Sequence, residues 1–295
     1  MRVGSGPERT ERAEAYASLY IPYAMISSIA YARPEQLDAN HCPDPERLGE
    51  AGDPSAPEWM QRLQAAGWRC VLGVSERLSC PDRYPDCQSA GLPDLQVWRR
   101  GSSCSELVVA FRGVNLRNIS DWSYLRRVLR LSNTSDYGRL QAQIDGILTH
   151  SGCRGAQKVV AVGHSFGGGY AEQAAYANRK IRYVYAFNSY PVRGFADPNP
   201  GARARTKTGL GIDSVEEAGE LFGWQRRLRQ QFADYCNPRF RAVKFNLVPI
   251  GLPSQQHNID TLTLNMIEVS RGAGAASGRR VAGEREAARC AAPGG

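Results

Sequence analysis

The segment that most constrains the fold of this chain is VVAVGHSFGGG at residues 159–169, where an apolar run meets a glycine-rich turn. The run predicts a buried strand, and the residues after the turn predict a helix. Gly163 and Gly167 stand two residues before and after Ser165, which allows a sharp strand-to-helix turn with the serine side chain above the sheet edge. The segment therefore makes Ser165 a candidate nucleophile; the alternative is a structural serine in a glycine-rich turn.

Strands alternate with helices along the chain, which predicts a mostly parallel central sheet with helices on both faces. A turn at Gly101 separates the first two clear strands. From Arg271 the chain is rich in Ala, Gly and Arg, so 271–295 is predicted to be a disordered tail after a single domain, 1–270, that contains a loop-rich, cysteine-containing segment at 42–104. The clearest predicted strands are LQVWRR (95–100), ELVVAFRG (106–113), KVVAV (158–162), IRYVYAF (181–187) and RAVKFNLV (241–248), and the last predicted helix is NIDTLTLNMIEV (258–269).

The longest uncharged stretch, Ala15–Ala32, is interrupted by Pro22 and rich in Tyr and Ser, which argues against a membrane span. Its final Ala-Tyr-Ala resembles a signal-peptidase site, but the preceding residues mix Glu with Arg instead of forming a basic region. A partly buried amphipathic helix, kinked or restarted near Pro22, is the favoured interpretation. We therefore expect a cytoplasmic protein, with export by another route left open.

Composition narrows the classes of partner. The formal net charge is +8, carried almost entirely by Arg, which suits anionic lipid or nucleic acid. No basic block is interleaved with aromatic residues, so no nucleic-acid partner is expected. There are 8 cysteines without a C-x-x-C pair and 4 dispersed histidines, so we expect no metal site. Whether the cysteines form disulfides or remain thiols is left open.

A serine nucleophile requires a base, because its neutral hydroxyl is weakly nucleophilic. In the fold that carries this elbow, the chain order is nucleophile, acid, histidine. His41 and His150 precede Ser165, and His164 adjoins it and should point elsewhere. His257 remains, in a loop after the strand at 241–248, and is the predicted base.

The acid is expected between Ser165 and His257. The segment GIDSVEEAGELFGWQ, at 211–225, is the one that can carry a strand end followed by a tight turn, at Gly219. We therefore favour Glu220, with Asp213 and Glu217 as alternatives. The full set of candidates is Asp197, Asp213, Glu216, Glu217, Glu220 and Asp234.

An oxyanion hole would take one backbone N–H from the residue after the nucleophile, Phe166. A second would come from a loop after an earlier strand. ELVVAFRG ends in such a position, and Gly113 permits close backbone approach, so Val114 is the predicted second donor.

Two segments together, ELVVAFRG followed by Asp121-Trp122 and the GHSFGGG elbow, resemble the class 3 (fungal-type) lipases of the α/β-hydrolase fold. The similarity extends over Leu95–Val269, and the family's serine and histidine fall on Ser165 and His257. It implies a serine carboxylic-ester hydrolase that acts on lipid or other acyl esters through an acyl-enzyme, without metal or organic cofactor.

This chain departs from the family pattern at two positions. The family usually has Ser or Thr after Phe-Arg-Gly, where this chain has Val114. The family's acid is usually an Asp followed by Pro, but Asp197-Pro198 follows its strand too closely, and Glu220 looks like a substitute.

The amphipathic segment NLRNISDWSYLRRVLRLSN (115–133) suits a lid or membrane-contacting helix, or a helix packed on the sheet. Alternative functions are an acyltransferase or thioesterase with the same triad, a non-catalytic lipase-like binding module, and an Arg-driven nucleic-acid binder.

Overall fold

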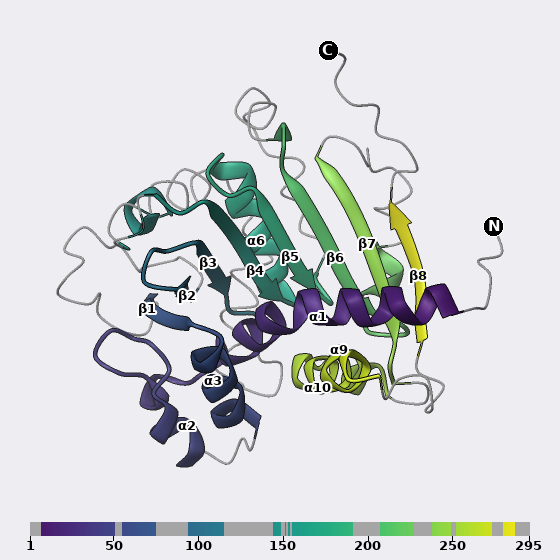
Figure 1. The fold of residues 1–295 in the computed structure, drawn as a ribbon, viewed down its shortest axis with the longest axis horizontal. Coiled ribbons are helices and arrows are strands. Elements are labelled where there is room, and N and C mark those ends of the chain that lie inside the picture. Colours follow the sequence, from purple (N-terminus) through teal and green to yellow (C-terminus); the bar gives the residue numbers. More distant parts are fainter. Residues whose placement is uncertain are drawn as a thin grey trace.

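Strands of the described chain form one eight-stranded sheet whose spatial order follows the sequence, from β1 to β8 (Figure 1). The central strands β3 to β7 are parallel, whereas β1–β2–β3 and β7–β8 pair antiparallel. The computed structural model describes residues 7–50, 55–74, 94–114, 144–148, 151, 153, 155–190, 207–226, 238–248, 252–272 and 280–286. The strands are β1 (Trp68–Val74), β2 (Leu95–Arg100), β3 (Glu106–Phe111), β4 (Lys158–His164), β5 (Tyr183–Phe187), β6 (Gly211–Glu217), β7 (Arg239–Asn246) and β8 (Arg280–Glu286).

Helices cover both faces of the sheet, which confirms the predicted α/β-hydrolase architecture. Alternate residues of the strands β1 to β7 supply the two cores: Val108 and Ala110 of β3 face one core, and Leu107 and Val109 face the other. The first core includes residues of α1 (Pro7–Ile29), α2 (Pro45–Glu50), α3 (Ser55–Ala65) and α10 (Ile259–Ser270); the second includes α6 (Phe166–Ala177) and helical residues at 144–148. The described chain also contains a short 3-10 helix, η1 (Pro34–Gln36), the short helix α9 (Pro253–His257) and helical residues at 223–226.

The N-terminal helix α1 is partly buried, as the sequence predicts, and lies across the sheet beside α10 (Figure 1). It continues through Pro22 without a restart. Two buried tyrosines attach it to the sheet: Tyr20 donates a hydrogen bond to Asp213 (2.9 Å) and Tyr23 to Glu106 (2.5 Å). Of the helices that the structure describes, none has the length and apolar character needed to cross a membrane.

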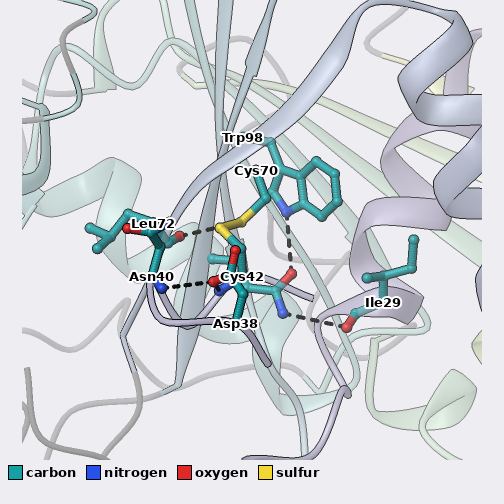
Figure 2. Close-up of a disulfide and its surroundings, with 8 residues drawn as sticks. Ile29, Asp38, Asn40, Cys42, Cys70, Leu72 and Trp98 are labelled. Carbon is teal, nitrogen blue, oxygen red and sulfur yellow. Dashed lines mark hydrogen bonds between the residues drawn. A yellow bond between two sulfur atoms is a disulfide. The ribbon is translucent and has the colours of Figure 1, made fainter. Parts of the chain in front are cut away.

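Two disulfides, Cys42–Cys70 and Cys104–Cys153, pair all of the cysteines in the described residues. Figure 2 shows the first of them beside the indole ring of Trp98. Asp38 closes the adjoining loop, because its carboxylate accepts the N–H groups of Asn40 and Cys42 (Figure 2). The bond therefore joins the segment after η1 to strand β1, and the choice between thiols and disulfides is decided for these four cysteines.

Two expectations about chain organisation need correction. The segment 42–104 is not mainly loop where it is described, because it contains α2, α3, β1 and β2, and Trp59 of α3 is fully buried against the α1 side of the sheet. The predicted disorder after Arg271 is wrong for Arg280–Glu286, which forms β8 beside β7. Backbone pairing at a sheet edge explains this, since it requires no large apolar side chains. Several features singled out in the sequence lie outside the described residues: the segment 115–133, Asp121-Trp122, His150, Asp197 and Asp234.

Candidate active site

Ser165 occupies the turn between β4 and α6 with φ 58° and ψ −126°, an unfavourable conformation for a residue with a side chain. Hydrogen bonds on both sides hold it there. Its N–H donates to the carbonyl of Phe187 (3.0 Å), and its own carbonyl accepts from Gly168 (3.2 Å) and Tyr190 (2.9 Å). Such a strained serine between a strand and a helix is the local geometry of a nucleophile elbow.

The glycines around Ser165 are required by close backbone packing. A Cβ on Gly163 would overlap the carbonyl group of Gly167, and a Cβ on Gly167 would overlap the carbonyl oxygen of Phe111 in β3. The elbow therefore packs directly against the end of the neighbouring strand. This contact brings the residues after β3 close to the turn that carries Ser165.

Ser165, His257 and Glu220 form a continuous hydrogen-bonded chain. His257 Nε2 lies 3.0 Å from Ser165 Oγ, and His257 Nδ1 lies 2.7 Å from Glu220 Oε2. A carboxylate accepts hydrogen bonds, so Nδ1 carries the proton and Nε2 is left to accept from the serine hydroxyl. All three side chains are buried, with Ser165 2% and His257 8% exposed. The structure thus brings together the three residues that the sequence singles out.

The supporting elements lie where the sequence predicts, with one difference. Strand β6 ends at Glu217, and Gly219, at φ 87°, turns the chain so that Glu220 faces His257. His257 itself is the last residue of the short helix α9, not a loop residue. Asn258 then caps α10 by accepting the N–H of Thr261 (2.9 Å).

The surroundings of Glu220 favour its ionised form. Burial raises the pKa of this carboxyl, but the His257 hydrogen bond, the charge of Arg226 and the Phe222 N–H lower it by more, so its pKa lies below the ordinary value. A negative charge next to His257 is therefore maintained at neutral pH.

The other described candidate acids bind other partners. Asp213 lies earlier in β6, where it accepts from Tyr20 and pairs with Arg241. Glu217 Oε1 accepts the backbone N–H groups of Leu247 (2.7 Å) and Val248 (3.0 Å), and burial raises the pKa of this carboxyl. These two alternatives to Glu220 support the sheet and the β7 loop instead of His257.

The predicted oxyanion donors lie at the same edge of the sheet as Ser165. Phe166 is the first residue of α6. Strand β3 pairs with β4 so that Phe111 is opposite Gly163, and the chain then leaves the sheet toward Val114, which is 6% exposed. Gly113 is needed on the way, because a Cβ there would overlap Tyr31 Oη and the carbonyl oxygen of His164.

His164 has a role that sequence reasoning missed. As expected, its ring nitrogens bind groups other than Ser165: Nε2 donates to the carbonyl of His257 (2.6 Å), and Nδ1 accepts from Tyr31 Oη (2.8 Å). A carbonyl only accepts, so the tautomer is determined by these two partners. Burial, with a smaller effect of His257, holds the pKa of His164 well below its usual value. A neutral imidazole therefore positions the backbone of His257.

Asn188 is a second missed residue, for which the sequence contains no signal. It follows β5 with φ 41° and is fully buried. Its amide nitrogen donates to the carbonyls of Gln256 (3.1 Å) and His257 (3.4 Å), and its amide oxygen accepts the N–H of Glu217 (2.8 Å). Asn188 thus joins the end of β6 to the segment that carries His257.

Aromatic rings surround His257 on one side. Phe222 meets the imidazole edge to face with 5.0 Å between ring centroids, and it also contacts Tyr190 at 5.2 Å. Phe166 stacks on Tyr190 at 4.4 Å. These rings reduce the access of water to the hydrogen-bonded chain, which strengthens its electrostatic interactions. Among the residues that the structure describes, no group of three or more His, Cys, Asp or Glu side chains is arranged to hold a metal ion.

Some solved structures of lipases are similar to this chain. No family model matches the chain, and no curated protein matches its sequence. Among solved structures, lipase II from Rhizopus niveus is similar at 13% identity over 83% of each chain, with a TM-score of 0.41. A deletion mutant of the lipase–propeptide complex from Rhizomucor miehei has 14% identity over 90% of this chain and 79% of that one, with a TM-score of 0.42. The native complex has 17% identity over 73% and 63%, with a TM-score of 0.36.

The mostly parallel sheet, the elbow after a central parallel strand and the turn after β6 are those of the α/β-hydrolase fold.

Proposed function

We propose that this protein is a serine carboxylic-ester hydrolase in which Ser165 is the nucleophile, His257 the base and Glu220 the orienting acid. The observation that supports this most directly is the hydrogen-bonded chain from Glu220 through His257 to Ser165 at the tip of a strained elbow. Groups in this order and at these distances are the requirement for general-base activation of a serine hydroxyl.

In the proposed reaction, Ser165 Oγ attacks the acyl carbonyl carbon while His257 Nε2 accepts the hydroxyl proton. The tetrahedral intermediate collapses, the ester C–O bond breaks, and the alcohol leaves with the proton from His257. Water then attacks the acyl-enzyme with His257 again as base, which releases the carboxylic acid and regenerates Ser165. The ionised Glu220 stabilises the imidazolium that forms in each half of the cycle.

The negative oxygen of each intermediate would be held by the N–H groups of Phe166 and Val114. Phe166 begins α6, so the positive end of that helix also favours an anion at this position. Removal of one such donor typically costs about 3 kcal/mol of transition-state stabilisation. Val114 offers only its backbone, because its side chain supplies no hydroxyl group to support the oxyanion.

The substrate class is proposed to be lipid or other acyl esters. The net charge of +8 favours approach to an anionic lipid surface.

We also propose that the protein acts in an oxidising compartment, in place of the cytoplasm expected from the sequence, because Cys42 pairs with Cys70 and Cys104 with Cys153 as disulfides. Peptide mapping of secreted protein under non-reducing conditions tests this, and free thiols at these four positions would contradict it.

The test is hydrolysis of p-nitrophenyl esters from acetyl to palmitoyl by wild-type protein and by Ser165→Ala. Ser27→Ala is a matched control, since Ser27 is a fully buried serine on α1. We expect turnover in the wild type and control only, and fluorophosphonate labelling that requires Ser165. Equal inactivity of folded wild type and Ser165→Ala would contradict the proposal and favour a binding module. An ester product formed with an added alcohol would indicate an acyltransferase.

A further inference from the structure

Arg226 contacts the carboxylate oxygen of the proposed triad acid that is not bound to His257. Its side chain is 3% exposed, and one of its terminal nitrogens, Nη2, pairs with Glu220 Oε1. Its Nε lies 3.1 Å from Glu216 Oε1, and its Nη1 donates to the carbonyl of Ser189 (2.5 Å). One guanidinium therefore joins the end of β6, the residue after Asn188 and the turn that carries Glu220.

A cation at this position would by itself oppose the function of the acid. Glu220 stabilises a protonated His257 through its negative charge, and a positive charge in direct contact with the same carboxylate cancels most of that effect. Glu216 resolves the conflict. Two carboxylates and one guanidinium leave one net negative charge, and the side chains of Glu216 and Glu220 are 5% and 0% exposed, so solvent screens this charge little.

The contacts also divide the two oxygens of Glu220 between different partners. Oε1 accepts a hydrogen bond from Arg226 Nη2, and Oε2 accepts one from His257 Nδ1. The Phe222 N–H lies 3.0 Å from Oε1 and 3.1 Å from Oε2, which fixes the plane of the carboxylate. Glu216 is held in turn by Ser214 Oγ, which donates to its Oε1 (3.0 Å). The low pKa of Glu220 is consistent with this set of donors.

We propose that Glu216 and Arg226 are positioning residues: Arg226 orients Glu220 toward His257, and Glu216 restores the negative charge that Arg226 would otherwise remove. The inference rests on the proposed function, in which His257 must be protonated during turnover. The other titratable or charged groups of the described chain near His257 are His164, whose ring centroid is 4.8 Å from that of His257, and Glu217, which binds the loop after β7. Both are present in every variant below.

The experiment compares Glu216→Gln, Arg226→Gln and the double variant. The first readout is the pH dependence of kcat/KM, whose acid limb reports protonation of the base. The second is the titration midpoint of the His257 ring, followed by NMR in a Ser165→Ala background, where no turnover is needed. Asp213→Asn is the matched control, because Asp213 is a buried carboxylate on the same strand that pairs with a different arginine, Arg241.

In Glu216→Gln, the uncompensated guanidinium should lower the His257 midpoint by about one pH unit, the size expected for one charge lost nearby in a medium of intermediate dielectric. Arg226→Gln should raise the midpoint, because two carboxylates remain. The double variant should return it close to the wild-type value, since Glu220 alone then supplies the single negative charge. Asp213→Asn should lower thermal stability and leave the midpoint unchanged.

A merely structural role predicts a different pattern, in which the damage from the two single substitutions adds in the double variant. An unchanged midpoint in Glu216→Gln, an equal shift in Asp213→Asn, or a double variant shifted further than Glu216→Gln would each overturn the proposal. If wild-type protein hydrolyses no ester, the proposed function fails, but the NMR midpoints still decide whether the cluster controls the charge at His257.

Discussion

Replacement of Glu220 by Gln is the sharpest test of the acid assignment, because the structure dictates how the new amide must lie. At the Oε1 position, Arg226 and the Phe222 N–H are both donors. The amide oxygen of Gln must therefore face them, which leaves its NH₂ group toward His257 Nδ1. An NH₂ donor there selects the tautomer with hydrogen on Nε2, and this nitrogen can no longer accept the proton of Ser165.

The expected loss follows from the tautomer rather than from packing. Substitution of the triad acid by its amide typically lowers kcat by about 10⁴-fold, equivalent to roughly 5.5 kcal/mol of transition-state stabilisation. The change is nearly isosteric, so the elbow and the position of His257 should be retained. Glu220→Gln should therefore fold, with near-normal KM and a very low kcat.

The assay is the initial rate of p-nitrophenyl butyrate hydrolysis, normalised to folded protein by circular dichroism. Glu217→Gln is the matched control: Glu217 is a buried carboxylate three residues away that accepts backbone N–H groups through one oxygen, as a Gln can. Activity of Glu220→Gln within about tenfold of wild type would refute the tautomer argument. A large loss in Glu217→Gln instead would place the acid at that residue.

Three further predictions concern the supports of the site. Tyr31→Phe removes the hydroxyl that donates to buried His164 Nδ1, so denaturant unfolding should show a loss of about 1–3 kcal/mol, and unchanged stability would contradict the hydrogen bond. Because the pKa of His164 is depressed in the folded protein, the unfolded state binds more protons than the folded state below pH 6.5. The free energy of unfolding should therefore fall as the pH drops below that value, by up to about 1.4 kcal/mol per pH unit. Urea unfolding between pH 7 and 5 measures this slope, and His164→Gln should flatten it. Gly167→Ala places a Cβ against the β3 backbone and should lower the melting temperature and activity together, whereas Gly146→Ala, with open space around the new Cβ, should be neutral or stabilising by about 1 kcal/mol; equal effects would refute the packing argument.

The fold and the three residues of the hydrogen-bonded chain were predictable from signals in the sequence. Apolar runs between turn residues marked the strands, and the glycines around Ser165 marked the elbow. His257 followed by elimination, since chain order excluded the other histidines. Glu220 was favoured because Gly219 could turn the chain after a strand, and the structure has that turn at positive φ.

The tertiary structure alone decided which polar groups meet. Tyr31 and His164 are 133 positions apart, and Asn188 reaches the carbonyl of His257 across 69 positions, so no local pattern records either contact. Strand β8 was missed for a similar reason: it is held by backbone pairing with β7, which its Ala-, Gly- and Arg-rich composition does not reveal.

The sequence by itself therefore determined the strand segments, the elbow and the residue types of the candidate site, because these depend on short-range periodicity and turn chemistry. The charge that His257 experiences depends on Glu216, Arg226 and Glu220 in one buried cluster. Glu216 and Glu220 come from the same fifteen-residue segment that predicted the acid, yet only folding removes them from water and gives each oxygen a separate partner. Burial and direction are properties of the packed chain, and they decide which carboxylate pairs with His257.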